Sequence, residues 1–447
     1  MIEAREYNGK WKIPDVDVSF NGTLTFSAKL GAELKLFGSF KQSFFDNNCK
    51  KIIIGETNAG RITLLDSYHR KTSSGKGIVT EIYEPSIIFE GISVLEESQL
   101  YFSSVVFRAH NLFQWFDSSD INITNERNNS KCYSINYQSR ENIEFSFREN
   151  TNGFISFDAP LTTNGVNNRI ELYEQAYVSF HYPRSTIYNE ILTDISRFIS
   201  FLTLVTFEQS YPTSIVLLDE NETSKKLEGK SFATIKCIYK HTRYSEKHKV
   251  RKSWHHLFSY TDISSIFAQT MENWFDLHEE MESVIMLLTN FFKNKYLFSE
   301  ERFMECIRAI ESFHRISHEN NKLPKQKYKE LVSQVKMNST LEGEDLKWLE
   351  AKLMGNEPSL GKRLEELINA YQNPFIEKNF TEKVCRDAKN SRNYYTHFDK
   401  SSAKKALQGA ELSDLTRKLR GLLISAIFTK LNIDYSIFVE KLHDRLD

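Results

Sequence analysis

The period of the apolar residues changes once along the chain, and this change limits the folds that the chain can adopt. From about residue 21 to about residue 220, apolar and polar residues alternate, as in the run 23–27 (TLTFS). From about residue 270 onward, apolar residues recur every three or four positions, as in Phe303, Ile307 and Ile310. Alternation is typical of a strand with one buried face, and the longer spacing is typical of an amphipathic helix. The chain is therefore predicted to join a β domain to a helical domain.

The expected domain boundaries follow from where each pattern ends. Residues 1–225 are predicted to form a mainly antiparallel β domain, sandwich-like or barrel-like, because short strands alternate with Asn, Ser, Gly and Asp turns. A helix is expected near 185–205, where the period is locally helical. Residues 269–447 are predicted to form an all-α bundle, so the fold class is α+β multidomain. Its expected helices cover 326–335, 342–354, 360–371, 381–398 and 435–446, with prolines in the gaps.

Residues 226–268 are predicted to form a basic connector. The formal net charge of the chain is −1, so any surface that binds nucleic acid must be local. The segment 240–252 holds six Lys or Arg and one acid, with aromatic residues interleaved, a mixture that suits phosphate neutralisation and base stacking. A solvated link between domains is the alternative. The RNA-binding candidates are Lys240, Arg243, Lys247, Lys249, Arg251 and Lys252.

Signals for export, membrane insertion and metal binding are missing from the sequence. The first ten residues contain no apolar run, and the longest apolar stretch, 198–207, is shorter than the roughly 20 residues that a spanning helix needs. We therefore expect a cytoplasmic protein without a membrane span. The five cysteines form no CxxC pair, and no nucleotide-binding loop motif occurs. We expect no disulfide framework, no metal and no cofactor.

Residues 391–397 (SRNYYTH) contain the groups best suited to chemistry on phosphate. A histidine such as His397 titrates near neutral pH and can act as general base or acid, and Arg392 can hold a phosphate through its rigid guanidinium. Asn393 lies four residues before His397 and can position it or bind the phosphate. On an ideal helix, Arg392 and His397 diverge by about 140°. Either the helix bends, or two copies of this face meet across a dimer.

Neighbouring residues suggest supporting roles. Glu311 can orient a catalytic Arg or His from an adjacent helix, or it can be a structural partner of Arg315. His314 is expected to be a satisfied histidine at the edge of the core. Tyr394 can stack on a base or simply pack at the boundary of the core. The apolar stripe predicted to face the core consists of Phe380, Val384, Ala388, Ser391, Tyr395 and Phe398.

Arg392, Asn393 and His397 match the RNxxxH motif of the HEPN superfamily, which contains helical ribonucleases and nucleotide-binding domains. The layout of the whole chain resembles the ApeA-type family of anti-phage defence proteins. This second resemblance depends on a β-rich first half that opens with Trp11, residues 21–24 (NGTL) and residues 34–36 (LKL), and on the helical second half that follows.

The resemblance implies a metal-independent endoribonuclease that works as a toxin in abortive infection. Its implied substrate is cellular or phage RNA, with transfer RNA as one candidate, cleaved by 2′-OH attack to a 2′,3′-cyclic phosphate. Arg392, Asn393 and His397 would act in a composite site of a homodimer, in response to a phage-derived trigger. The alternative is a non-catalytic protein that binds RNA, nucleotides or a partner and dimerises through the helical bundle.

Overall fold

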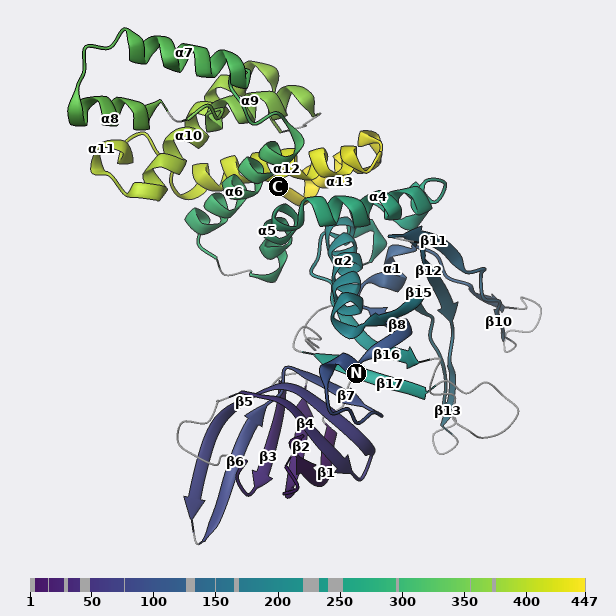
Figure 1. Ribbon diagram of the computed structural model, residues 1–447. Coiled ribbons are helices and arrows are strands. Elements are labelled where there is room, and N and C mark those ends of the chain that lie inside the picture. Colours follow the sequence, from purple (N-terminus) through teal and green to yellow (C-terminus); the bar gives the residue numbers. More distant parts are fainter. Residues whose placement is uncertain are drawn as a thin grey trace. The chain divides into compact units, whose positions relative to one another are not determined.

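In the computed structural model the chain forms two compact units, residues 1–275 and 276–447 (Figure 1). The first unit is rich in antiparallel strands and the second is helical, so the predicted fold class is confirmed. The described residues are 5–14, 16–27, 31–40, 49–75, 77–125, 133–148, 150–164, 169–219, 233–239, 252–294, 297–353, 355–371 and 375–446.

The first unit is organised around a 13-stranded antiparallel sheet in the order β11-β12-β15-β8-β16-β17-β7-β5-β4-β1-β2-β3-β6. Two small hairpins, β9-β10 and β13-β14, lie outside this sheet. The strands are β1 Arg5–Lys12, β2 Phe20–Ser27, β3 Gly31–Phe37, β4 Cys49–Thr57, β5 Gly60–Gly75, β6 Ile78–Glu84, β7 Ile87–Glu90, β8 Tyr101–Ala109, β9 Ile121–Asn125, β10 Tyr133–Tyr137, β11 Ile143–Phe147, β12 Thr151–Asp158, β13 Leu161–Asn164, β14 Arg169–Leu172, β15 Gln175–Ile187, β16 Pro212–Asp219 and β17 Ala233–Tyr239.

Strand β5 closes the first six strands into a barrel. Its first part pairs with β4 and β7, and its second part pairs with β6, which also pairs with β3. Figure 1 shows these strands curving around one another. Closure pairs β5 with strands at both ends of this group, and the inward residues fill the interior. The buried interior cluster comprises Tyr7, Trp11, Leu24, Phe26, Leu34, Leu36, Phe40, Ile53, Ile62, Leu64, Tyr83, Ile88 and Ile238.

Outside the barrel, strands β8 and β15 of the sheet contact helix α2, Tyr188–Thr206. This helix lies within a few residues of the helix expected near 185–205. A shorter helix, α1 Leu112–Trp115, contacts β15.

Strand β17 falls inside residues 226–268, the range expected to be a connector, and it pairs with both β16 and β7. The sheet therefore continues into a stretch that looks like a linker in sequence, because polar segments flank it on both sides.

In the second unit, α6 contacts α5, α9, α10 and α12. The helices expected from sequence are present and begin and end within three residues of the predicted positions. Among the described residues, no helix is both long and apolar enough to cross a membrane. The helices from residue 260 onward are α3 Tyr260–Ile263, α4 Phe267–Glu280, α5 Glu282–Lys293, α6 Ser299–Ser317, α7 Lys325–Met337, α8 Gly343–Lys352, α9 Leu360–Ala370, α10 Thr381–His397, α11 Lys400–Ala403, α12 Gly409–Lys430 and α13 Tyr435–Leu446.

Trp11 is the largest side chain in the barrel interior and it determines where glycine is needed. The indole is fully buried, and its Nε1 donates a hydrogen bond to the carbonyl oxygen of Gly22 at 3.1 Å. A Cβ on Gly55 would lie 2.4 Å from Cζ3 of the same ring. Glycine at this strand position thus allows the backbone to approach the indole closely.

We predict that Gly55→Ala destabilises the barrel by about 1 to 3 kcal/mol, because the new methyl group overlaps the buried Trp11 ring. Urea unfolding of the full chain, with hydrogen exchange of the β1 and β4 amides, measures the effect. Gly75→Ala is the control, since Gly75 lies at the end of β5 with open space around its Cβ position. Equal stability of the two variants would contradict the prediction.

Candidate functional site

Helix α10 carries the RNxxxH motif in its last two turns. The helix continues without interruption from Thr381 to His397, so the wide angle expected between Arg392 and His397 on an ideal helix applies here. It ends because Phe398 adopts a left-handed backbone conformation, with φ of 51°. The Phe398 amide still donates to the carbonyl oxygen of Tyr394, at 2.6 Å, which caps the last turn.

The buried face of α10 is shorter than the sequence pattern predicts. Val384, Ala388 and Ser391 are buried, as expected. The prediction is wrong at the two ends of the stripe, because Phe380 is 50% exposed and Phe398 is 66% exposed. Phe380 precedes the helix, and the chain leaves the helical path at Phe398, so neither side chain continues the helical stripe.

The Arg392 guanidinium is held on two sides. Its Nη2 donates to Oε1 of Glu311 on α6 at 3.3 Å, and its Nη1 donates to Oδ1 of Asn393 at 3.3 Å. Arg392 and Glu311 are both partly exposed, so the ion pair can open to admit a ligand. The pair that sequence alone proposed for Glu311, with Arg315, is not the one formed. Arg315 instead bonds to Glu357 at 2.8 Å.

Arg392 and Asn393 border a cavity of about 470 Å³ formed by α6, α9, α10 and the segment before α9. Five basic and two acidic side chains line it, so the formal charge of the lining is positive. The lining residues are Arg308, Glu311, Ser312, Arg315, Glu357, Pro358, Ser359, Leu360, Arg363, Lys389, Arg392 and Asn393. Of these, only Arg392, Asn393 and Glu311 were predicted from the sequence to be site residues. The spacing of three and four in Arg308, Glu311 and Arg315 could have indicated a charged helix face.

His397 lies outside this cavity, exposed at the end of α10. Among the described residues, no carboxylate lies within ion-pair distance of its ring. The nearby Asp399 has its pKa lowered chiefly by the Ser401 hydroxyl and amide, which donate to its carboxylate, and to a smaller degree by His397. Within one chain, therefore, Arg392 lines the cavity whereas His397 faces solvent at the end of the helix.

Aromatic rings surround the end of α10. The Tyr394 ring lies 5.0 Å from that of Tyr395 and 5.6 Å from that of Phe398, measured between centroids. The Tyr395 hydroxyl donates to the carbonyl oxygen of Leu407 at 2.8 Å, which anchors the base of the group. The result is a partly exposed aromatic surface beside His397, suitable for a base or for a second protein surface.

His314 is a fully buried residue of α6 with partners on both ring nitrogens. Arg363 Nη1 donates to Nδ1 at 3.0 Å, and Nε2 lies 2.7 Å from Oε2 of Glu366. Because the Arg363 guanidinium can only donate, Nδ1 of His314 accepts. Nε2 therefore carries the ring hydrogen and donates a hydrogen bond to the Glu366 carboxylate. This tautomer leaves His314 no free nitrogen with which to act on a substrate.

The basic segment predicted to bind RNA lies almost wholly outside the described residues. Lys240, Arg243, Lys247, Lys249 and Arg251 belong to that part of the chain. Lys252 is described, and its Nζ lies 4.6 Å from the centroid of the Trp254 ring, a cation–π contact at an exposed position.

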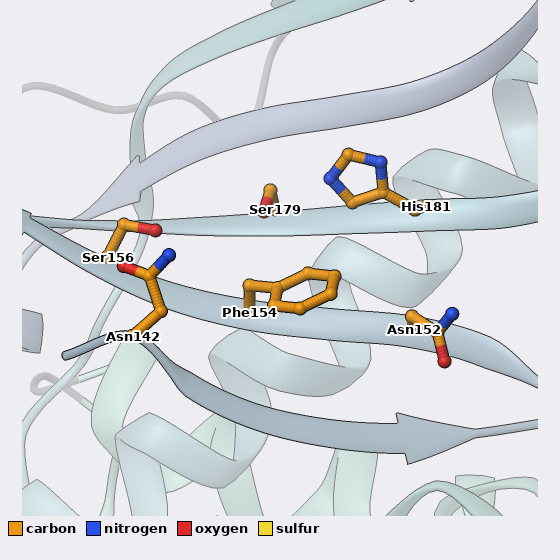
Figure 2. Close-up of a pocket in the computed structure, with 6 residues that line it drawn as sticks. All are labelled: Asn142, Asn152, Phe154, Ser156, Ser179 and His181. Carbon is orange, nitrogen blue, oxygen red and sulfur yellow. The ribbon is translucent and has the colours of Figure 1, made fainter.

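A second cavity, of about 500 Å³, lies on the sheet of the first unit (Figure 2). Residues at every second position of β12 and β15 project to the same face, and Figure 2 shows Phe154 and His181 side by side on neighbouring strands. Their ring centroids are 5.3 Å apart. Asn142, Asn152, Ser156 and Ser179 complete a polar lining with one aromatic ring. No residue of this cavity was singled out from the sequence.

Thiol chemistry and metal ligation are poorly supported by the described residues. Burial raises the pKa of Cys306 to about 12 and the pKa of Cys385 to about 11, so both thiols stay protonated at neutral pH. Within the described ranges, no three His, Cys, Asp or Glu side chains are grouped closely enough to hold a metal ion.

Comparison with known families agrees with this division of the chain. Residues 6–274, more than half of the chain, match the family model for the ApeA N-terminal domain 1, and residues 304–436 match the Apea-like HEPN domain. The chain belongs to the ApeA-like proteins. The resemblance expected from the sequence is thereby confirmed. Arg392, Asn393, His397 and Glu311 all lie within the Apea-like HEPN match. No curated protein and no solved structure matches the chain.

We predict that His314→Ala destabilises the helical unit by about 2 to 4 kcal/mol, because it leaves the buried Arg363 and the Glu366 carboxylate without their shared partner. Urea unfolding followed by helical circular dichroism measures the loss. His318→Ala is the control, because the more exposed His318 ring stacks on His314 at 4.7 Å and bonds to the neighbouring Ser317 hydroxyl, but has no buried charged partner among the described residues. Unchanged stability in His314→Ala would show that this buried network contributes little.

Proposed function

We propose that this ApeA-like protein is a metal-independent endoribonuclease of the HEPN type, acting in the cytoplasm as an anti-phage toxin. One observation carries the proposal. Arg392 and Asn393 of the RNxxxH motif border a positively charged cavity, on the helix that ends with an exposed His397, inside the part of the chain that matches the Apea-like HEPN domain. A phosphodiester substrate needs both a cationic surface for its charge and a group that transfers protons, and the cavity and His397 offer these two functions.

In the proposed reaction, the RNA 2′-oxygen attacks the adjacent phosphorus and the bond to the 5′-oxygen breaks. His397 takes the proton from the 2′-OH or delivers one to the departing 5′-oxygen. Arg392 leaves Glu311 to hold the phosphate and offsets the charge that develops on its oxygens. Asn393 already contacts Arg392 and is close enough to share that phosphate. The products are a 2′,3′-cyclic phosphate and a 5′-hydroxyl.

The geometry of a single chain favours a composite site in a homodimer. Arg392 faces the cavity and His397 lies outside it, since α10 is helical throughout and separates the two side chains by a wide angle. The exposed rings of Tyr394 and Phe398 beside His397 offer apolar surface for a partner copy. A second chain that brings its own α10 to this face would supply the missing group.

The proposed role in defence is abortive infection, in which the toxin cleaves cellular or phage RNA once a phage-derived trigger is sensed. We assign the sensing to the β-rich first unit, whose cavity at Phe154 and His181 is a candidate ligand site. Transfer RNA is the first substrate to test. The alternative is a non-catalytic protein that binds RNA, nucleotides or a partner. The ion pair of Arg392 with Glu311 also suits this alternative, as the state of the surface before a ligand binds.

The first prediction is that His397→Ala abolishes RNA cleavage. Purified wild type and variant would be incubated with total RNA and with transfer RNA in EDTA, and the fragment ends analysed. We expect 2′,3′-cyclic phosphate ends from wild type and a loss of at least about 100-fold in the variant, the usual contribution of a general acid or base. Arg386→Ala, an exposed change elsewhere on α10, is the control. Equal cleavage by wild type and His397→Ala would refute the assignment. A protein that only binds RNA would cleave none and keep its affinity in the variant.

The second prediction concerns the composite site. Arg392→Ala and His397→Ala chains would be co-expressed with different affinity tags and isolated as mixed dimers. If each site takes Arg392 from one chain and His397 from the other, one of the two sites is intact, and about half of the wild-type activity returns. Mixed dimers as inactive as either parent would place both groups in one chain. Failure to isolate any mixed dimer would contradict the dimer itself.

A further inference from the structure

The cavity beside Arg392 contains more positive charge than one phosphate contact requires. Its five basic residues are opposed by two carboxylates, which leaves a formal surplus of three charges. Glu311 pairs with Arg392, while Glu357 is shared by Arg315 and Arg363. Within the part of the chain that the structure describes, no carboxylate lies within ion-pair distance of Arg308 or Lys389. These two side chains are therefore available to a ligand.

The back of the cavity is rigid. Arg363 is almost fully buried, and it donates to the carbonyl oxygen of Pro358 at 3.1 Å, to His314 Nδ1 at 3.0 Å and to Glu357 at 3.1 Å. Nε, Nη1 and Nη2 each donate one of these bonds, so the guanidinium is fixed in place as a positive charge on one side of the cavity. The first turn of α9 begins beside it at Ser359 and Leu360, and its amides and helix dipole add to the positive potential.

The lining also indicates what kind of group fits. None of the described residues that line the cavity is aromatic, so a nucleobase would meet no aromatic ring there and could stack only on a guanidinium. Its volume of about 470 Å³ lies in the range of small-ligand sites. Lys389 and Arg392 are three residues apart on α10, and Arg308 is three residues before Glu311 on α6. The first spacing puts the two cations of α10 about 4.5 Å apart along the helix axis, and the second puts Arg308 within one turn of the carboxylate that pairs with Arg392. The cations can therefore reach successive groups of an extended strand.

We propose that this cavity is a second phosphate subsite for the RNA strand, in which Arg308 and Lys389 bind a backbone phosphate next to the one that Arg392 holds. The inference rests on the proposed function, since it assigns the cavity to the same substrate. It adds that the protein recognises its RNA at this point through the backbone and not through a base. Arg363 contributes positive potential rather than direct contact, because its guanidinium is already bound to Pro358, His314 and Glu357.

The test measures binding without cleavage. Full-length protein carrying His397→Ala would be titrated with a fluorescein-labelled single-stranded RNA at several salt concentrations, alone and with Arg308→Ala or Lys389→Ala added. Lys383→Ala is the matched control, because Lys383 is an exposed lysine of α10 that does not line the cavity. All three substitutions replace exposed side chains, and circular dichroism confirms folding.

We expect Arg308→Ala and Lys389→Ala each to weaken RNA binding by about 3- to 10-fold and to lower the slope of log affinity against log salt by about 0.7, as the loss of one phosphate contact does. The control should change neither. If both cavity variants bind like the control while wild type cleaves RNA and His397→Ala does not, the subsite is refuted and the nuclease stands. If wild type cleaves nothing but the two variants show the expected losses, the phosphate subsite stands and the nuclease is refuted. If a parallel titration with AMP shows weaker binding in the two cavity variants while their RNA binding is unchanged, the cavity holds a free nucleotide and the subsite is refuted.

Discussion

The buried guanidinium of Arg363 holds together the part of the helical unit on which the candidate site depends. It connects His314 of α6 to the start of α9 and to the segment that precedes it, through three hydrogen bonds. A buried charge with poor partners would destabilise the fold, so its bonds have to form together. Once they form, α6 and α9 are fixed relative to one another, and α10 completes the cavity with Lys389 and Arg392.

The barrel of the first unit and the helices around the candidate site of the second are held together by different means. In the first, the long strand β5 closes a barrel whose interior is apolar apart from a few satisfied groups, with Trp11 fitted against Gly22 and Gly55. In the second, charged side chains such as Arg363 take part in the packing itself. The barrel interior is therefore expected to keep its conformation when a ligand binds. The Arg392 guanidinium, in contrast, can exchange the Glu311 carboxylate for a ligand.

Much of the fold was predictable because amphipathic periods are local. The bounds of α9, α10 and α13 follow from apolar spacing and from the prolines between helices. The motif residues Arg392, Asn393 and His397 were found through spacing and resemblance, and Glu311 through its place on the stripe. The burial of Arg363 was not predictable, since its partners His314 and Pro358 are brought to it by tertiary packing. The exposure of Phe398 depends on one backbone angle, which composition does not reveal.

The order of the units has a consequence for how the protein is made. Because translation proceeds from the N-terminus, residues 1–275 leave the ribosome before the helical unit is complete. At roughly 5 to 20 residues per second, the remaining 172 residues take about 10 to 30 s to synthesise. The barrel and its sheet have that interval in which to fold while α10 is still being made. Any restraint that the first unit exerts on the proposed nuclease can thus be in place before Arg392 and His397 exist in folded form.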